Sequence, residues 1–255
     1  YKDRVKEAKL LDEQLPEYQF DKSGAIREWS MKEYKENNAH RHISHLYCAW
    51  PSYQTQNDTS LADACRQAIV NRNRENTGKD DTASHGWIHK ALVEARLKNS
   101  EAVYDILNLL VHSDIFYTSL FTDHNTNRAK GVACTDTLFG IAGIVNEMLV
   151  YSDRSTIELF PALSSRIPDG KVCGLMTRAG VRIDSLEWCI NTGTEGLKTD
   201  MKDGFYIELK ITALRDTEFG LILKNENFNE MSKEDKALFN QNIKLKSGEK
   251  YAILL

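Results

Sequence analysis

Three histidines and an arginine crowd one short stretch, NAHRHISHLYCAWPS, which runs from Asn38 to Ser52 and has only weak helical periodicity. They are His40, Arg41, His42 and His45. Dense side-chain donors on a connecting segment more often serve binding or catalysis than packing, because the surrounding helices and strands hold such a segment still. The pattern therefore predicts that this stretch forms the floor of a functional site.

Two kinds of chemistry fit these histidines. An HxH pair on an extended segment points both rings to the same side, and imidazole nitrogens bind zinc or iron. A catalytic metal site, however, usually has a carboxylate or a third ligand at a characteristic spacing in the sequence. Arg41 also places a positive charge between two of the histidines, which is unfavourable beside a metal cation. We favour hydrogen-bonding histidines in a polar pocket and expect no cofactor and no metal. A metal-dependent enzyme that uses His40, His42 and His45 stays an alternative.

Asp136 lies at the end of a long irregular segment, residues 113–135, where an apolar helix is expected to begin. Asp is a favoured N-cap, and the positive end of the helix dipole stabilises its charge by about 0.3–1 kcal/mol. A purely structural role as an N-cap would therefore explain an aspartate at this position. A carboxylate held ionised at a helix start can also orient a nucleophilic water or polarise its base, so Asp136 is the candidate catalytic residue.

Aromatic rings beside carboxylates point to sugar binding. Glu28 precedes Trp29, and Trp87 lies in a helical pattern. Each Trp has an alternative role as a large core residue, since Trp is usually deeply buried. No GxSxG elbow, P-loop or GxGxxG motif occurs, so serine-hydrolase and nucleotide chemistry have no support. The five cysteines form no CxxC pair, and we interpret them as free thiols.

The elements that must position these residues change in character along the chain. Helical apolar spacing occurs in residues 3–11, 59–74, 82–97, 100–112 and 136–151, and strand-like alternation occurs in 156–163, 171–190, 204–214 and 219–224. The last helix is apolar enough to be an inner helix. A loop or short helix is expected at 224–236. The chain is therefore expected to be an α+β multidomain protein, with a helical domain at 1–152 and a β domain at 153–255.

Composition narrows the classes of partner. The 255 residues are 41% hydrophobic, which allows a sizeable core. A net charge of -4 provides no basic field for nucleic acid. No apolar run approaches the roughly 18 residues of a membrane span, so no membrane partner is expected. The chain starts at Tyr1 within a helical pattern, which suggests a missing N-terminal part, and its compartment could be secreted, periplasmic or cytoplasmic.

Six blocks of sequence resemble, in order, the C-terminal half of glycoside hydrolase family 95, the 1,2-α-L-fucosidases and related α-L-galactosidases. The blocks are IREW, HRHISHLY, SHGWIHKALVEARL, LFTDH, DTLFGIAGIVNEML and IELFPALSSRIPDGKVCGLMTRAG. They span about residues 24–188, and the last is the most specific. The resemblance implies that residues 1–152 are part of an (α/α)6 toroid, a helical barrel, and that residues 153–255 form a C-terminal antiparallel β-sandwich.

The same resemblance implies inverting hydrolysis of a terminal α-linked fucose or related sugar from an oligosaccharide. In this family an aspartate polarises an asparagine that activates water, and Asp136 in DTLFG matches the aspartate of the family's DGNFG stretch. Arg41 and His42 match an Arg-His pair that binds the sugar. Glu28 matches the glutamate of a QEW pattern, and His124 the histidine of an LFDxH pattern. Trp87 is added as an aromatic substrate-binding candidate.

Two departures from the family pattern limit this expectation. Thr137 and Leu138 stand where the family has Gly and Asn, which suggests a divergent member and leaves open whether its sugar is fucose. The family's general acid and its water-holding asparagines lie upstream of the matched part, so the chain alone is expected to be inactive. A non-catalytic carbohydrate-binding or scaffolding fragment stays open. The hypothesis predicts that Asp136, Arg41 and His42 approach one another in one pocket.

Overall fold

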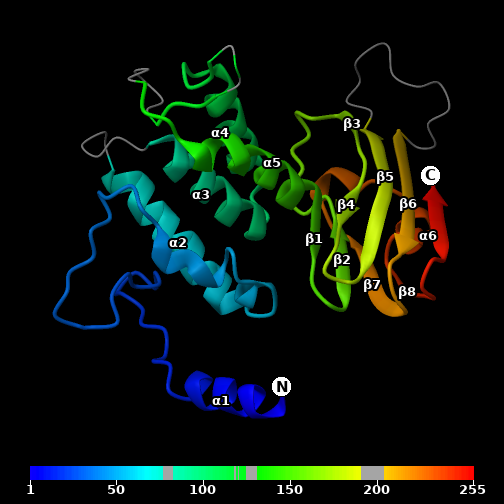
Figure 1. Cartoon of the computed structure of the whole chain (residues 1–255). Coiled ribbons are helices and arrows are strands. Elements are labelled where there is room, and N and C mark those ends of the chain that lie inside the picture. The colour runs from blue at the N-terminus through cyan, green and yellow to red at the C-terminus, as the bar shows by residue number, and fades with distance from the viewer. Residues whose placement is uncertain (77–82, 118, 120, 125–130, 191–203) are drawn as a thin grey trace. The chain divides into compact units, whose positions relative to one another are not determined.

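The computed structural model describes residues 1–76, 83–117, 119, 121–124, 131–190 and 204–255. The chain divides into two compact units, Tyr1–Thr82 and Ala83–Leu255, and each is described by itself (Figure 1). The expected domain boundary after residue 152 stays a prediction. In the described part of the chain, no helix is both long and apolar enough to cross a membrane.

The first unit contains two α-helices and two 3₁₀ turns. They are α1 (Lys2–Asp12), η1 (Ser44–Cys48), η2 (Gln54–Gln56) and α2 (Thr59–Glu75). Helix α2 begins as the sequence predicts, because the Asp58 side chain accepts a hydrogen bond from the Leu61 backbone N–H at 3.0 Å. Its apolar stripe is buried, whereas no residue of α1 is. The histidine stretch runs through η1, whose Leu46 and Cys48 are buried.

Three longer helices open the second unit: α3 (Ser84–Arg96), α4 (Ser100–His112) and α5 (Thr135–Leu149). Helices α3 and α4 confirm the helical spacing predicted at 82–97 and 100–112, and a short connection joins them. This connection requires a left-handed backbone at Lys98, with φ of 61°. The Lys98 Nζ lies 2.8 Å from both carboxylate oxygens of Glu158, and this interaction offsets part of the backbone strain.

Helix α5 approaches α3 closely because two glycines face that helix. A Cβ added at Gly140 would lie 2.3 Å from the Ile88 Cγ2 atom, whereas one added at Gly143 would lie 3.7 Å from the nearest Leu92 atom. The expectation that α5 is an inner helix of a toroid stays a prediction, and in this chain the Phe139 side chain is 72% exposed. Burial on α5 is confined to the side that faces α3 and the strands.

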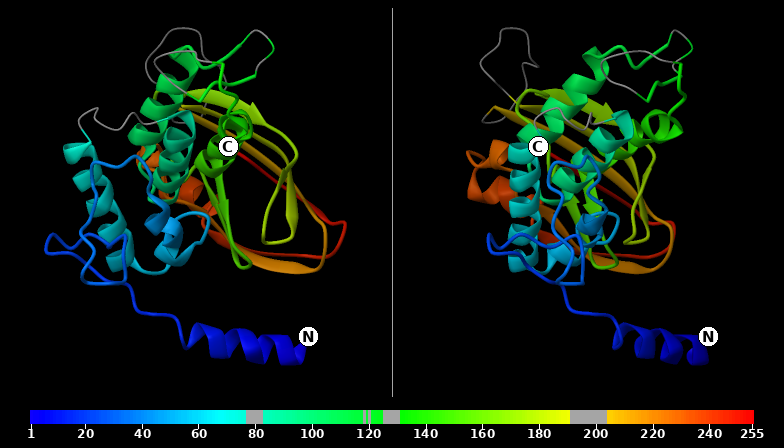
Figure 2. Two further views of the ribbon diagram at one scale, coloured as in Figure 1. Left: turned by 60° about the vertical axis from the view of Figure 1, so that its left-hand side comes forward. Right: turned by 90° about the vertical axis from the view of Figure 1, so that its left-hand side faces the viewer.

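Strands dominate the rest of the second unit and form two sheets among the described residues. One sheet has the order β1 (Val150–Ser152), β2 (Thr156–Leu159), β7 (Thr217–Leu223) and β8 (Gln241–Leu245). The other has the order β3 (Asp169–Val172), β5 (Val181–Ile190), β6 (Phe205–Ala213) and β9 (Lys250–Leu254), and β4 (Leu175–Met176) pairs with β5. Figure 2 shows β9, in red, beside the long strands.

The pairing of these strands corrects one detail of the expected fold. Strands β2 and β7 run parallel, so the β region is not wholly antiparallel. The sequence also missed three strands, β1, β8 and β9. Between β7 and β8 lie η3 (Glu226–Phe228) and the helix α6 (Lys233–Leu238), which confirms the short-helix alternative for residues 224–236. The toroid and the sandwich themselves stay predictions.

The most specific block of the family resemblance has a packing role. Phe160 is fully buried, and its ring centroid lies 5.4 Å from that of Trp188 and 5.3 Å from that of Phe228. Gly170 lies against the same indole, since an added Cβ would lie 2.4 Å from the Trp188 ring. Trp188 is therefore a core residue, and the glycine of the PDG motif makes room for it.

Candidate functional site

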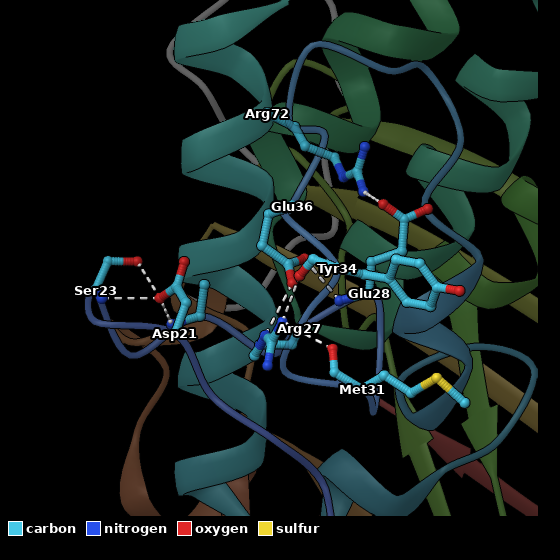
Figure 3. A network of polar contacts seen from close by, with 9 residues as sticks. Asp21, Ser23, Arg27, Glu28, Met31, Tyr34, Glu36 and Arg72 are labelled. Atoms are coloured by element: carbon cyan, nitrogen blue, oxygen red, sulfur yellow. Dashed lines mark hydrogen bonds and ion pairs between the residues drawn. The ribbon is translucent and has the colours of Figure 1, made fainter.

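Arg72 of α2 holds the histidine segment in the first unit (Figure 3). Its Nη1 donates to the backbone carbonyls of His40 at 2.8 Å and Asn37 at 3.1 Å. Its Nη2 pairs with the Glu28 Oε2 atom at 3.1 Å. The two side chains are only 6% and 14% exposed, so this ion pair is largely shielded from water. Arg72 thereby joins α2, the Glu28 segment and the start of the histidine stretch.

A second ion pair fixes Glu28 from the other side. Arg27 Nε pairs with Glu36 Oε1 at 3.0 Å, and its Nη2 donates to the Tyr34 carbonyl at 2.7 Å. The other oxygen of Glu36 accepts the Glu28 backbone N–H at 2.7 Å. Figure 3 shows these bonds closing the segment between residues 27 and 36 into a compact loop. The position of Glu28 is therefore determined by both its backbone and its carboxylate.

The histidine segment brings two of its rings together. The ring centroids of His40 and His42 lie 4.8 Å apart at an interplanar angle of 59°, which agrees with the prediction that an HxH pair points to one side. Arg41 between them is half-buried. Within the described ranges, no group of three or more His, Cys, Asp or Glu side chains converges as a metal-ligand set. The geometry of these residues therefore gives the metal alternative no support.

In the second unit, buried hydroxyl groups tie the starts of α3 and α5 together. Thr137 Oγ1 donates to Ser84 Oγ at 2.6 Å, and Ser84 Oγ donates to the Asp123 carbonyl at 2.8 Å. The Ser84 backbone N–H donates to the His124 carbonyl at 2.8 Å. These bonds place the His124 ring beside that of His85, with centroids 5.0 Å apart. The segment that carries His124 is thus anchored to the helix that carries Asp136.

Asp123 supports the same segment from inside. Its side chain is fully buried, and its Oδ2 accepts hydrogen bonds from the Tyr117 hydroxyl and the Gly131 backbone N–H, each at 2.7 Å. The hydrogen bond to this carboxylate raises the pKa of Tyr117, because it stabilises the protonated phenol. Asp123 therefore positions the residue that follows it, His124.

Asp136 lies in the first turn of α5 rather than at its cap. The helix begins at Thr135 with Cys134 as the capping residue, so the N-cap interpretation of Asp136 is wrong by two positions. The side chain is exposed, and no residue of the described segments donates a hydrogen bond to its carboxylate. The carboxylate still lies near the positive end of the helix dipole.

The two tryptophans beside the predicted site differ in environment. Trp29 is 44% exposed, with the Tyr34 ring centroid 5.5 Å away, so its alternative role as a core residue is wrong for this chain. Trp87 is half-buried on α3, and the Lys90 Nζ atom lies 5.1 Å from its ring centroid. Burial lowers the pKa of Lys90, since desolvation disfavours its charged form.

The predicted site residues thus fall into two groups. Glu28, Arg41 and His42 belong to the first unit, and Trp87, His124 and Asp136 belong to the second. The close approach of Asp136 to Arg41 and His42 stays a prediction. Sequence reasoning missed Asp123, whose side-chain partners lie only 6 and 8 residues away. It also missed Arg72, whose partners lie 32 to 44 residues away, and Ser84, whose partner Asp123 lies 39 residues away. No periodicity reports contacts of that range.

A cavity of about 430 Å³ lies elsewhere in the second unit. It is lined by residues of α5, of β1 and β4 and of the turn after β4, among them Asn146, Glu147, Ser152 and Arg178. None of the predicted site residues lines it. Glu147 pairs with the buried Arg96 of α3, so the polar wall of this cavity belongs to the packing of the helices.

Comparison with known proteins assigns the family. The model of the glycosyl hydrolase family 95 catalytic domain matches residues 1–149. Alpha-L-fucosidase 2 of Arabidopsis thaliana is 34% identical over 187 residues, which cover 68% of this chain and 21% of that protein. Probable alpha-fucosidase A of Aspergillus oryzae is 29% identical over 178 residues, which cover 63% of this chain and 25% of that protein. The chain therefore spans only about a fifth to a quarter of the length of these curated relatives, and it belongs to glycosyl hydrolase family 95.

Proposed function

We propose that this chain contributes the C-terminal part of the active site of an inverting glycosidase that releases a terminal α-linked fucose or related sugar from an oligosaccharide. The observation that carries the proposal is the position of Asp136 in the first turn of α5, inside the family match and tied through Thr137 and Ser84 to the His124 segment. The names of the relatives, alpha-L-fucosidase and alpha-fucosidase, support the substrate class.

Asp136 helps to activate the nucleophilic water. Its ionised carboxylate polarises the amide that holds the nucleophilic water, and the water attacks the anomeric carbon from the face opposite the leaving oxygen. The general acid that protonates that oxygen comes from a part of the protein outside this chain. Because inversion needs both the general acid and the group that activates water, the 255-residue chain alone is expected to be inactive.

The remaining residues bind the sugar. Arg41 and His42 donate hydrogen bonds to its hydroxyls, His124 adds a further polar contact, and Trp87 offers an aromatic face. Glu28 binds Arg72 through Oε2 and presents Oε1 as an acceptor for a sugar hydroxyl. The toroid is expected to bring the two groups of residues to one pocket.

Proton NMR of the reaction tests this proposal in the whole protein that carries the chain. With a 1,2-α-L-fucosylated oligosaccharide, the first product detected is expected to be β-L-fucose, which mutarotates later. Initial release of α-L-fucose would contradict the inverting mechanism. Binding of the oligosaccharide without any release of sugar would instead favour a carbohydrate-binding role.

A further inference from the structure

Two buried cysteines of the first unit lie in contact. Cys48 ends the η1 turn and Cys65 lies on the buried face of α2, and their sulfur atoms are 3.4 Å apart. The two residues are 1% and 0% exposed. A disulfide bond is about 2.0 Å long, so the sulfurs need to approach by about 1.4 Å (3.4 minus 2.0).

We propose that Cys48 and Cys65 are a redox pair that forms a disulfide and then fixes the histidine segment to helix α2. The proposal rests on the geometry of the first unit and does not depend on the glycosidase function. The expectation of five free thiols is confirmed in this structure, and the proposal adds that two of these thiols can be oxidised to a disulfide. Two cysteines 17 positions apart in the sequence match no spacing motif that would predict a disulfide or a metal site.

The hydrogen bond between the two sulfurs makes the pair chemically asymmetric. It lowers the pKa of Cys48, because the Cys65 thiol stabilises the Cys48 thiolate by donating to it. The same bond raises the pKa of Cys65, and burial raises it further. Cys48 is therefore the attacking sulfur, since the thiolate is the nucleophile in thiol–disulfide exchange.

The oxidant is a low-molecular-weight disulfide such as oxidised glutathione. The Cys48 thiolate attacks one sulfur of that disulfide, breaks its S–S bond and releases one glutathione thiolate. Cys65 then loses its proton and attacks the Cys48 sulfur of the mixed disulfide, which releases the second glutathione. Two electrons pass from the cysteines to the oxidant, and the two thiol protons go to solvent or to the released thiolates. Burial confines the exchange to folding or to local opening of the unit.

The disulfide would restrain a segment whose position already depends on Arg72. Closing a loop of this length removes chain entropy from the unfolded state, and a Tm rise of about 5 °C or more is expected in the oxidised protein. The His40 carbonyl, which Arg72 binds, lies eight residues before Cys48 in the sequence, so oxidation stabilises the segment at its second end.

Peptide mapping tests the proposal on the purified protein. Trypsin cleaves after Arg41 and Arg66, so both cysteines fall in one peptide, residues 42–66. The protein is refolded in a buffer of reduced and oxidised glutathione, denatured, and alkylated with iodoacetamide. The oxidised peptide is expected to take no alkyl group and to weigh about 2 Da less than its reduced form. Further cleavage before Asp58 and Asp63 should leave residues 42–57 joined to 63–66.

Two variants complete the design. Cys173→Ser removes an exposed thiol and should leave the mass shift and the Tm rise unchanged. Cys48→Ser should abolish both and leave Cys65 with only a glutathione adduct. Two alkylated cysteines, or two glutathione adducts, in the oxidised wild-type peptide would overturn the proposal. The mapping uses the wild-type protein, so it decides the matter even if Cys48→Ser fails to fold.

Discussion

At Arg72, one buried guanidinium determines the geometry of a segment that carries two predicted sugar ligands. It binds two backbone carbonyls before Arg41 and His42 and pairs with the Glu28 carboxylate. The sequence predicted the helix on which Arg72 lies and the importance of the histidine stretch. It could not predict the link between them, because an arginine in a helical pattern looks the same whether its head reaches solvent or a distant loop.

Replacing Arg72 by Met should destabilise the first unit by about 3–5 kcal/mol, because the Glu28 carboxylate then stays shielded from water without its partner. Arg72→Lys should give an intermediate loss, since an ammonium cannot reproduce the forked contacts. Urea unfolding followed by tryptophan fluorescence measures both.

Arg74→Met is the matched control for this prediction. Arg74 lies on the same helix, but its side chain is 65% exposed and pairs with the neighbouring Glu75. A change within about 0.5 kcal/mol is expected. Equal losses in Arg72→Met and Arg74→Met would show that the buried ion pair is not what holds the segment.

At the scale of elements, helices were predicted better than strands. Local sequence patterns were enough to predict the helix α2 that Asp58 caps, its apolar stripe, and the helices α3 and α4. Strand β1 was absorbed into the apolar run of α5, and β8 and β9 were missed because five-residue strands with mixed polarity resemble loops. The parallel pairing of β2 with β7 depends on residues about 60 positions apart, which alternation alone cannot reveal.

Gly140 and Gly143 make a matched test of how α5 packs on α3. Gly140→Ala should destabilise the second unit by about 1–3 kcal/mol, because its Cβ meets the stiff β-branched Ile88 at 2.3 Å. Gly143→Ala should be neutral or stabilising by up to about 1 kcal/mol, since its Cβ fits and Ala favours the helix. Thermal unfolding of both variants measures the difference. Equal stabilities would contradict the packing of these two helices.

At the scale of the whole molecule, family membership came from the order of motifs rather than from any one of them. The last motif proved to serve packing, through Phe160, Gly170 and Trp188. The proposed catalytic chemistry depends on Asp136 and on upstream residues that the family resemblance implies. The joint prediction for Asp136, Arg41 and His42 could be made only from the family resemblance, because residues more than 90 positions apart in the sequence leave no local pattern.

The role of Asp136 is tested most directly by the kcat of Asp136→Asn in the whole protein on a 1,2-α-L-fucosylated oligosaccharide. Loss of the carboxylate that assists the water should lower kcat about 10²-fold to 10⁴-fold while the Tm stays within about 2 °C. Asp63→Asn, an exposed aspartate of α2 paired with Arg66, should keep the wild-type kcat. An Asp136→Asn enzyme with the wild-type kcat would remove Asp136 from the mechanism and contradict the account.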